Sequence, residues 1–138
     1  MYYESTIDWG TQVDLLRCNP KFWGHPRYDF IIADLQPRGQ VFAKLVCLFT
    51  YTIGKSVHPL ALVQALDRQP RSGDVRNIDK KLSIYRWNLR PRNRCEIISI
   101  HNIVRGALLI PDSIYSGDHF VVDTIDADMF LRVKQMHS

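Results

Sequence analysis

The chain has 138 residues, the usual size of one domain, and 46% of them are apolar, which is enough to bury a core without disulfides or metal. Charged residues make up 23% of the chain, so disorder along its whole length is not expected. The sequence holds no run of about 18 apolar residues and no N-terminal pattern of a secretory signal. We therefore expect an intracellular protein with no membrane contact.

The N-terminal residues 1–24 have no clear periodicity. We expect an irregular lead-in there, with one helical turn near Thr11–Arg17. Residues 25–138 are expected to form a single β-rich domain, because turn-forming residues separate short apolar segments throughout this part of the chain.

Alternating β-branched and aromatic residues predict the strands of this domain. Val41–Thr52 is apolar on both alternate faces, which is typical of a central strand that is buried on both sides. Residues 57–66 fit a strand or a helix, and residues 67–81 have the polar composition of a long exposed loop. The predicted strands are Tyr28–Leu35, Val41–Thr52, Leu82–Leu89, Cys95–Ile100, Ala107–Ile110 and Asp118–Ile125.

Two helical segments are expected beside the strands. His101–Gly106 is predicted to form one turn, and Asp126-Ala127-Asp128 to begin a short terminal helix over Met129–Val133. The fold class is therefore mostly β: a small, partly open β-barrel of six or seven strands with a short C-terminal helix. The predicted core comprises Phe30, Ile32, Leu45, Cys47, Phe49, Leu62, Val63, Ile84, Ile98, Ile103, Leu109, Val121, Val122 and Phe130.

Residue patterns for catalysis or metal binding are absent from the sequence. There is no G-x-S-x-G, no G-x-G-x-x-G and no Walker pattern. Cys18, Cys47 and Cys95 form no C-x-x-C pair, which predicts three free thiols in a reducing compartment. The aspartates near the C-terminus lack the spacing of a calcium loop, and helix capping is their simpler role. We expect no enzyme, no cofactor and no metal.

The positive charge gathers in residues 68–105, which carry ten basic and three acidic side chains. Arg90, Arg92 and Arg94 alternate within Arg-Pro-Arg-Asn-Arg, and in an extended chain they would point the same way at roughly the spacing of nucleic-acid phosphates. Aromatic side chains beside them offer a stacking surface. The predicted nucleic-acid-binding residues are Lys80, Lys81, Arg86, Trp87, Arg90, Arg92 and Arg94.

Five apolar-rich segments stand out along the chain: Pro26–Asp34, Phe42–Gly54, Pro59–Asp67, Arg90–Asp112 and Gly117–Val133. They resemble the C-terminal part of basidiomycete fungal proteins of transposon origin, the Plavaka-type transposase-like group. The resemblance covers roughly residues 19–134. It implies an accessory domain without the catalytic RNase-H-like core, so no catalytic residue is carried over. The order of strands is also similar to that of bromo-adjacent-homology modules, which are β-rich chromatin readers. Both resemblances imply a nuclear location.

Three functions remain open at this stage: a nucleic-acid accessory module, a chromatin or protein-interaction module, and a structural domain with no independent activity. The partner is expected to contact the basic segment 68–105, and the oligomeric state is open. A methyl-lysine reader needs several aromatic faces around one cation. The candidates for such a cage are Tyr51, Tyr85, Trp87 and Tyr115.

Overall fold

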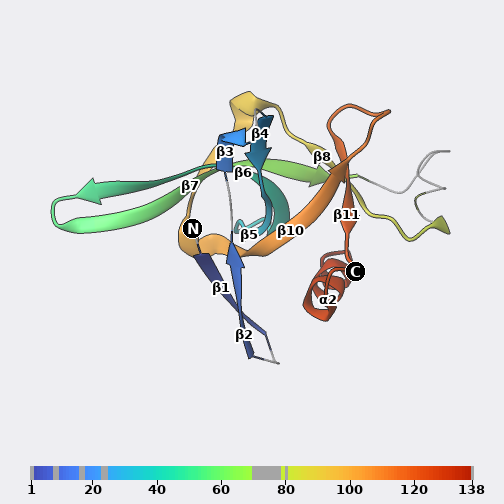
Figure 1. Ribbon diagram of the computed structural model, residues 1–138, viewed down its shortest axis with the longest axis horizontal. Coiled ribbons are helices and arrows are strands. Elements are labelled where there is room, and N and C mark those ends of the chain that lie inside the picture. Colours follow the sequence, from blue (N-terminus) through green and yellow to red (C-terminus); the bar gives the residue numbers. More distant parts are fainter. Residues whose placement is uncertain are drawn as a thin grey trace.

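The computed structural model describes residues 2–7, 10–15, 18–22, 25–69, 79 and 81–137, with the backbone alone for residues 2–28 (Figure 1). The architecture is mostly β. Seven antiparallel strands follow the order β6-β5-β10-β11-β8-β7-β9, and a further pairing between β6 and β7 makes the arrangement ring-like. One short C-terminal helix completes it, so the expected fold class of a partly open β-barrel is confirmed.

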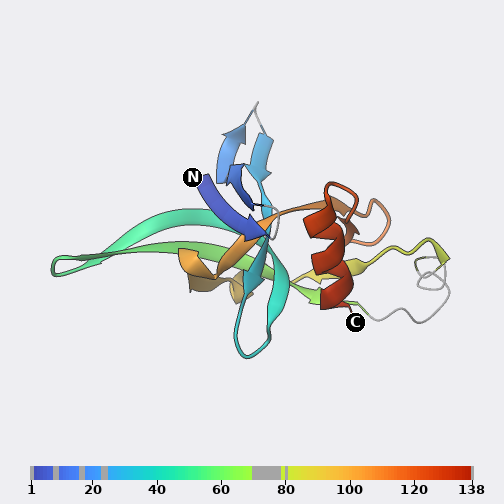
Figure 2. The ribbon, with the colours of Figure 1, turned by 90° about the horizontal axis from the view of Figure 1, so that it is seen from below.

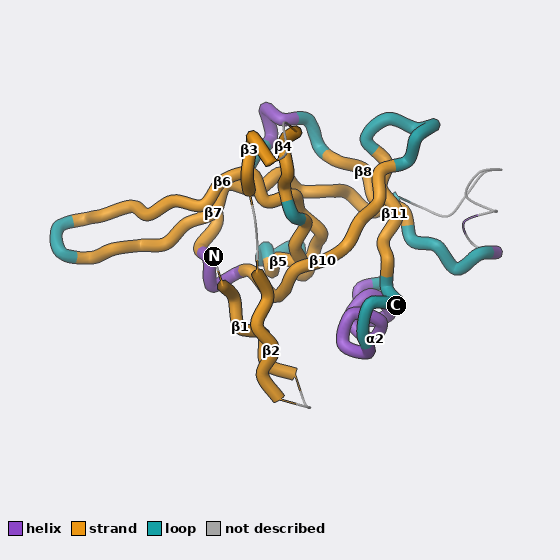
Figure 3. Tube along the Cα trace, viewed as in Figure 1, coloured by secondary structure: helices purple, strands orange, loops and turns teal. Residues whose placement is uncertain are grey.

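The strands of this sheet are short, apart from one long hairpin, β6–β7 (Figure 3). Two smaller hairpins near the N-terminus form separate two-stranded sheets. The sheet strands are β5 (Phe30–Asp34), β6 (Gln40–Ile53), β7 (Ser56–Arg68), β8 (Arg86–Leu89), β9 (Glu96–Ser99), β10 (Ile103–Pro111) and β11 (Asp118–Val122). The small hairpins are β1 (Tyr2–Ile7) with β2 (Gly10–Leu15) and β3 (Cys18–Phe22) with β4 (His25–Tyr28). The helical elements are η1 (Arg92–Arg94), η2 (Ile100–Asn102) and α2 (Ala127–Met136).

The N-terminal segment differs from the expected irregular lead-in. The predicted helical turn at Thr11–Arg17 is wrong, because Gly10–Leu15 is a strand that pairs antiparallel with β1, with Tyr2 opposite Leu15. The strand pairing satisfies backbone groups that an isolated turn leaves open. β3 also pairs with β4 across the expected boundary at residue 24. The division into a lead-in and a domain itself stays a prediction.

The hydrophobic core consists of two clusters. One lies among β5, β6, β7, β9 and β10, and the other is covered by α2 through Met129 and Val133. Of the predicted core, the side chains that are buried are Ile32, Leu45, Val63, Ile98, Ile103, Leu109 and Val121. Those that are half-buried are Phe30, Leu62, Ile84 and Val122.

Three predicted core residues are exposed: Cys47, Phe49 and Phe130. For the first two, the reason is that only the first half of β6 is covered on both faces. A register shift follows Leu45, and beyond it the β6–β7 hairpin leaves the body of the protein (Figure 2). Phe130 lies on the outer side of α2, whose inner side is formed by Met129 and Val133, one helical turn apart.

The terminal helix begins where the sequence predicts it. The Asp126 carboxylate accepts a hydrogen bond from the Met129 backbone N–H at 2.7 Å and so acts as the N-cap. Arg105, buried on β10, donates to both Asp126 and Asp128 at 3.0 and 2.8 Å. These charge-assisted bonds join the start of α2 to the sheet. The capping role predicted for these aspartates is therefore confirmed.

Candidate anion-binding surface

The three alternating arginines do not lie in an extended chain. Arg92–Arg94 forms a 3₁₀ helix, η1, in which the Arg94 N–H donates to the Pro91 carbonyl at 2.9 Å. A 3₁₀ helix has three residues per turn, so side chains two positions apart diverge. The expectation that Arg90, Arg92 and Arg94 point the same way is wrong for this reason.

Arg90 is held by carboxylates on both sides. Its guanidinium donates to Asp67 at 2.8–3.0 Å, and Nη1 lies 3.6 Å from the Glu96 carboxylate. The hydrogen bond from Arg90 is the main cause that lowers the pKa of Asp67. Arg38, from the turn before β6, donates to both oxygens of the Glu96 carboxylate, at 2.7 Å to Oε1, the oxygen that also lies nearest Arg90. Two arginines are thus fixed in place around one glutamate.

Arg92 and Arg94 remain exposed, and neither has an ion pair within the described part of the chain. Lys44 of β6 lies near Arg92, since burial and then the positive charge of Arg92 lower its pKa. Lys44 also pairs across the sheet with Gln64, whose amide donates to the Arg90 carbonyl. We call the group of Arg38, Lys44, Arg90, Arg92 and Arg94 the η1 surface. The carboxylates of Asp67 and Glu96 lie within it.

Sequence reasoning missed two members of this surface, Arg38 and Lys44. Each has a recognisable feature in the sequence. Arg38 is the charged residue of a Pro-x-Gly turn, and Lys44 is the only charged residue within an apolar strand. They lie some fifty residues before η1 in the sequence, and the pairings of β6 with β7 and of β7 with β9 bring them close.

Arg86 does not belong to the surface, because its side chain is only 6% exposed. It forms ion pairs with Asp79, Asp112 and Asp118, at 2.8 Å for the first and 3.0 Å for the last. The Phe120 ring lies 4.4 Å from its guanidinium carbon. Hydrogen bonds to Asp79 are the main cause that raises the pKa of Arg86. The three aspartates neutralise the charge of Arg86 inside the protein. The prediction that Arg86 lies on an outer positive surface is therefore wrong.

Trp87 is likewise buried. Its ring packs edge-on against Phe42 with centroids 4.9 Å apart, and its indole N–H donates to His137 Nε2 at 2.9 Å. Tyr85 stacks on the same imidazole at 3.9 Å. The indole therefore offers no face for stacking with a base, because the core and the C-terminal His137 cover it.

Of the two predicted lysines, the structure describes Lys81 alone. Lys81 is exposed and precedes the start of β8, whereas η1 follows the other end of that strand. Lys80 lies outside the described residues. The expected continuous surface of six cations is therefore replaced by a smaller one of different composition.

The candidate aromatic cage is dispersed. Tyr85 and Trp87 flank His137, Tyr115 lies 5.5 Å from the Arg86 guanidinium, and Tyr51 is on the projecting hairpin. Tyr85 and Trp87 do lie close to each other, but His137 of the same chain already packs against both rings. The geometry offers no common cage for methyl-lysine among these four residues.

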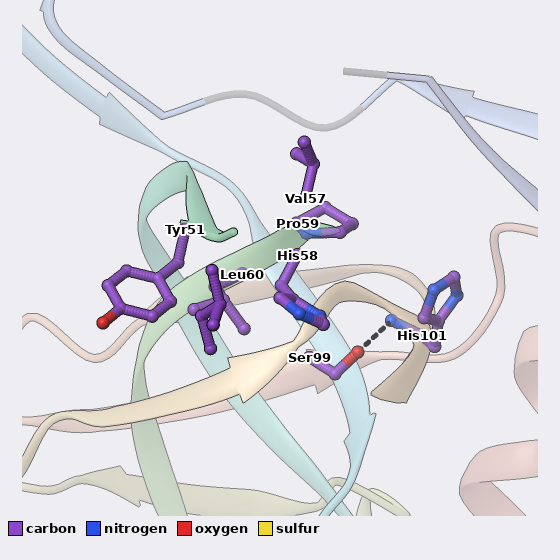
Figure 4. Close-up of a pocket in the computed structure, with 8 residues that line it drawn as sticks. Tyr51, Val57, His58, Pro59, Leu60, Ser99 and His101 are labelled. Atoms are coloured by element: carbon purple, nitrogen blue, oxygen red, sulfur yellow. Dashed lines mark hydrogen bonds between the residues drawn. The ribbon is translucent and has the colours of Figure 1, made fainter. Parts of the chain in front are cut away.

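Two pockets in the described part of the chain are open to solvent. One of about 370 Å³ lies beside the long hairpin, with mostly apolar walls (Figure 4). In it Ser99 Oγ accepts from the backbone N–H of His101, which is a helix-cap contact and not a nucleophile–base pair. A second pocket of about 450 Å³ is lined by Arg38 and Glu96 among others.

Among the described residues, no three His, Cys, Asp or Glu side chains are grouped as metal ligands. Nor is any helix there long and apolar enough to cross a membrane. The chain matches no protein-family model, no curated protein and no solved structure.

Proposed function

We propose that this chain is a non-catalytic binding module that contacts nucleic acid through the η1 surface. The observation that supports this most is the convergence of five cations from the turn before β6, from β6 itself and from the β8–η1 segment. Arg92 and Arg94 have no ion pair in the described part of the chain, so their charge is available to an outside anion.

The geometry suits phosphate groups. Arg38 and Arg90 share Glu96, which orders their planar guanidinium groups, and ordered arginines can bind phosphate oxygens in a bidentate manner. Asp67 and Glu96 offset part of the positive charge. Contacts to only a few phosphates are therefore expected, which fits a module that assists a larger assembly.

The resemblance to transposase-like proteins agrees with a nucleic-acid partner and with a nuclear location. Lys81, Arg86 and Trp87 do not take part in the η1 surface, and Lys80 lies outside the described residues. The proposal therefore rests on Arg92 and Arg94, together with Arg38, Lys44 and Arg90. A structural domain with no independent activity is the alternative that the experiment tests.

The test measures binding of the full chain to a fluorescent duplex and to a single-stranded oligonucleotide over a range of salt concentrations. Each phosphate contact adds about 0.9 to the log–log slope for duplex DNA and about 0.7 for a single strand. Arg92→Gln with Arg94→Gln should flatten the slope by about two contacts. Lys81→Gln with Lys134→Gln removes the same charge elsewhere and should leave the slope unchanged.

Two results oppose the proposal. One is the absence of binding at low salt, and the other is an equal loss of slope in the control variant. The second would show that the net charge alone attracts the nucleic acid. Urea titration of each variant checks that the fold persists, as expected for exposed charges.

A further inference from the structure

The distal half of the β6–β7 hairpin projects from the body as an arm, defined here as residues 46–59 (Figures 1 and 2). Within the described strands, β6 pairs with β5 only up to Lys44, and beyond it with β7 alone. The Leu45 N–H donates a hydrogen bond to the Asp29 carbonyl at 2.8 Å. Among the described strands, none pairs with the outer edge of β6 from residue 46 to the tip, although β3 and β4 contact β6.

The tip fixes which backbone groups face this edge. Gly54 and Lys55 form a two-residue turn, with a positive φ of 57° at Gly54, so Ile53 and Ser56 are a hydrogen-bonded pair. Hydrogen-bonded and non-bonded pairs alternate in antiparallel sheets. Thr52 and Thr50 thus direct their N–H and C=O groups outward, away from β7.

The two edges of the arm are not equivalent. On β7, Pro59 lies opposite Thr50 and has no N–H to offer, and from Leu60 onward β9 covers the edge. On β6, residues 46–53 include neither a proline nor a charged residue. Natural proteins protect open strand edges with such residues, so an unprotected edge marks a site for strand pairing.

Apolar side chains follow the same open strand. Phe49, Tyr51 and Ile53 share one face and are 37%, 56% and 60% exposed. The arm also contains no acidic residue. Exposed apolar surface of this kind is typical of an interaction site.

We propose that the arms of two copies of this chain pair edge to edge through β6, antiparallel, about a two-fold axis at Thr50. In this register Thr50 pairs with the partner's Thr50, and Thr52 with the partner's Leu48. Phe49 then lies opposite the partner's Tyr51, and the symmetry repeats this aromatic pair once. The inference is independent of nucleic-acid binding.

The dimensions and charges of the arm favour a second copy over an unrelated strand. The open edge of each copy ends at Leu45, whose N–H already donates to the Asp29 carbonyl. In this register the partner's turn lies beside that same residue. Lys55 of that turn is thereby brought to the segment that carries Asp29, so a positive charge meets a negative one at both ends of the pairing. A random partner strand offers no such match.

Two paired strand segments are expected to bury less surface than the roughly 1,200–2,000 Å² that is usual for stable complexes. The dimer should therefore dissociate on dilution at protein concentrations on the order of micromolar. Sedimentation velocity of the full chain over a concentration series measures this directly. A reversible monomer–dimer equilibrium without larger species is expected, because an isologous interface closes on itself.

Two matched variants test the edge. Thr50→Pro removes the outward N–H of β6 and should abolish the dimer, while Val57→Pro changes an outward position of β7 and should preserve it. A second pair tests the face without altering the backbone. Tyr51→Lys should abolish the dimer, and Val57→Lys, at a site 61% exposed on the opposite face, should not.

Three results would overturn the proposal. They are a monomer at every concentration, a dimer that survives both Thr50→Pro and Tyr51→Lys, and equal dissociation in the Val57 variants. Far-ultraviolet circular dichroism and urea midpoints establish which variants are folded. Because the lysine pair leaves the backbone intact, it decides the question if either proline variant fails to fold.

Discussion

Arg86→Met offers the sharpest test of how this fold is held together. The guanidinium lies between three carboxylates, and the side chains of Arg86 and Asp79 are each only 6% exposed. Methionine keeps an unbranched apolar side chain like the aliphatic part of arginine, without the guanidinium and its charge. The substitution leaves three carboxylates close together with their common counter-ion removed.

Breaking a buried ion pair by removing one partner typically costs about 3–5 kcal/mol, because the remaining charge is left uncompensated. Asp118 keeps a hydrogen bond from Asn88, and Asp112 keeps one from the Ile114 N–H. These partners reduce the cost, so we expect a loss near the lower end, about 3 kcal/mol. That is a large part of the stability of a domain of this size.

The pH dependence of the loss follows from the carboxylates. The pKa of Asp112 is lowered by the Ile114 N–H and then by Arg86. A carboxylate whose pKa is lower in the folded than in the unfolded protein contributes stability above its unfolded pKa of about 3.9. That contribution is lost as the pH falls through the folded pKa. The difference between wild type and Arg86→Met should therefore narrow below about pH 4.

Urea titration followed by tryptophan fluorescence measures the free energy of unfolding of both proteins. Arg92→Met is the matched control, because this arginine is exposed and has no ion pair in the described part of the chain. It should change stability by less than about 0.5 kcal/mol. A loss below about 1 kcal/mol for Arg86→Met, or an equal loss in both, refutes the reasoning.

Other substitutions probe the core, the buried histidine and the helix cap, each by urea titration. Phe42→Ala should cost about 3–5 kcal/mol because this ring is fully buried, and Phe49→Ala under about 1 kcal/mol because it lies on the arm; similar costs would contradict the core assignment. Burial lowers the pKa of His119, so stability should decline as the pH falls below about 6.5, and His119→Gln should remove that slope. Asp126→Ala should cost about 1–2 kcal/mol and Asp126→Asn less, since asparagine also caps helices; equal costs would assign the loss to the ion pair with Arg105.

The candidate surface was only partly predictable, because its members depend on contacts that are distant in the sequence. Arg86 meets Asp112 and Asp118, 26 and 32 positions further along the chain. Nothing in the local pattern LSIYRWNL distinguishes such an arginine from an exposed one. Arg38 and Lys44 join the surface for the same reason, through the pairings of β6 with β7 and of β7 with β9.

Local patterns sufficed for the mostly β class, most strand positions and the capped terminal helix, because alternation, turn residues and capping act within a few neighbouring residues. They also identified Ile32, Leu45 and Val63 as core. Whether the second face of a strand is covered depends on what packs against it, and for that reason Phe49 was misplaced. The tertiary structure alone decided that β6 leaves the body as an arm, that Arg86 and Trp87 are buried, and which cations remain outside.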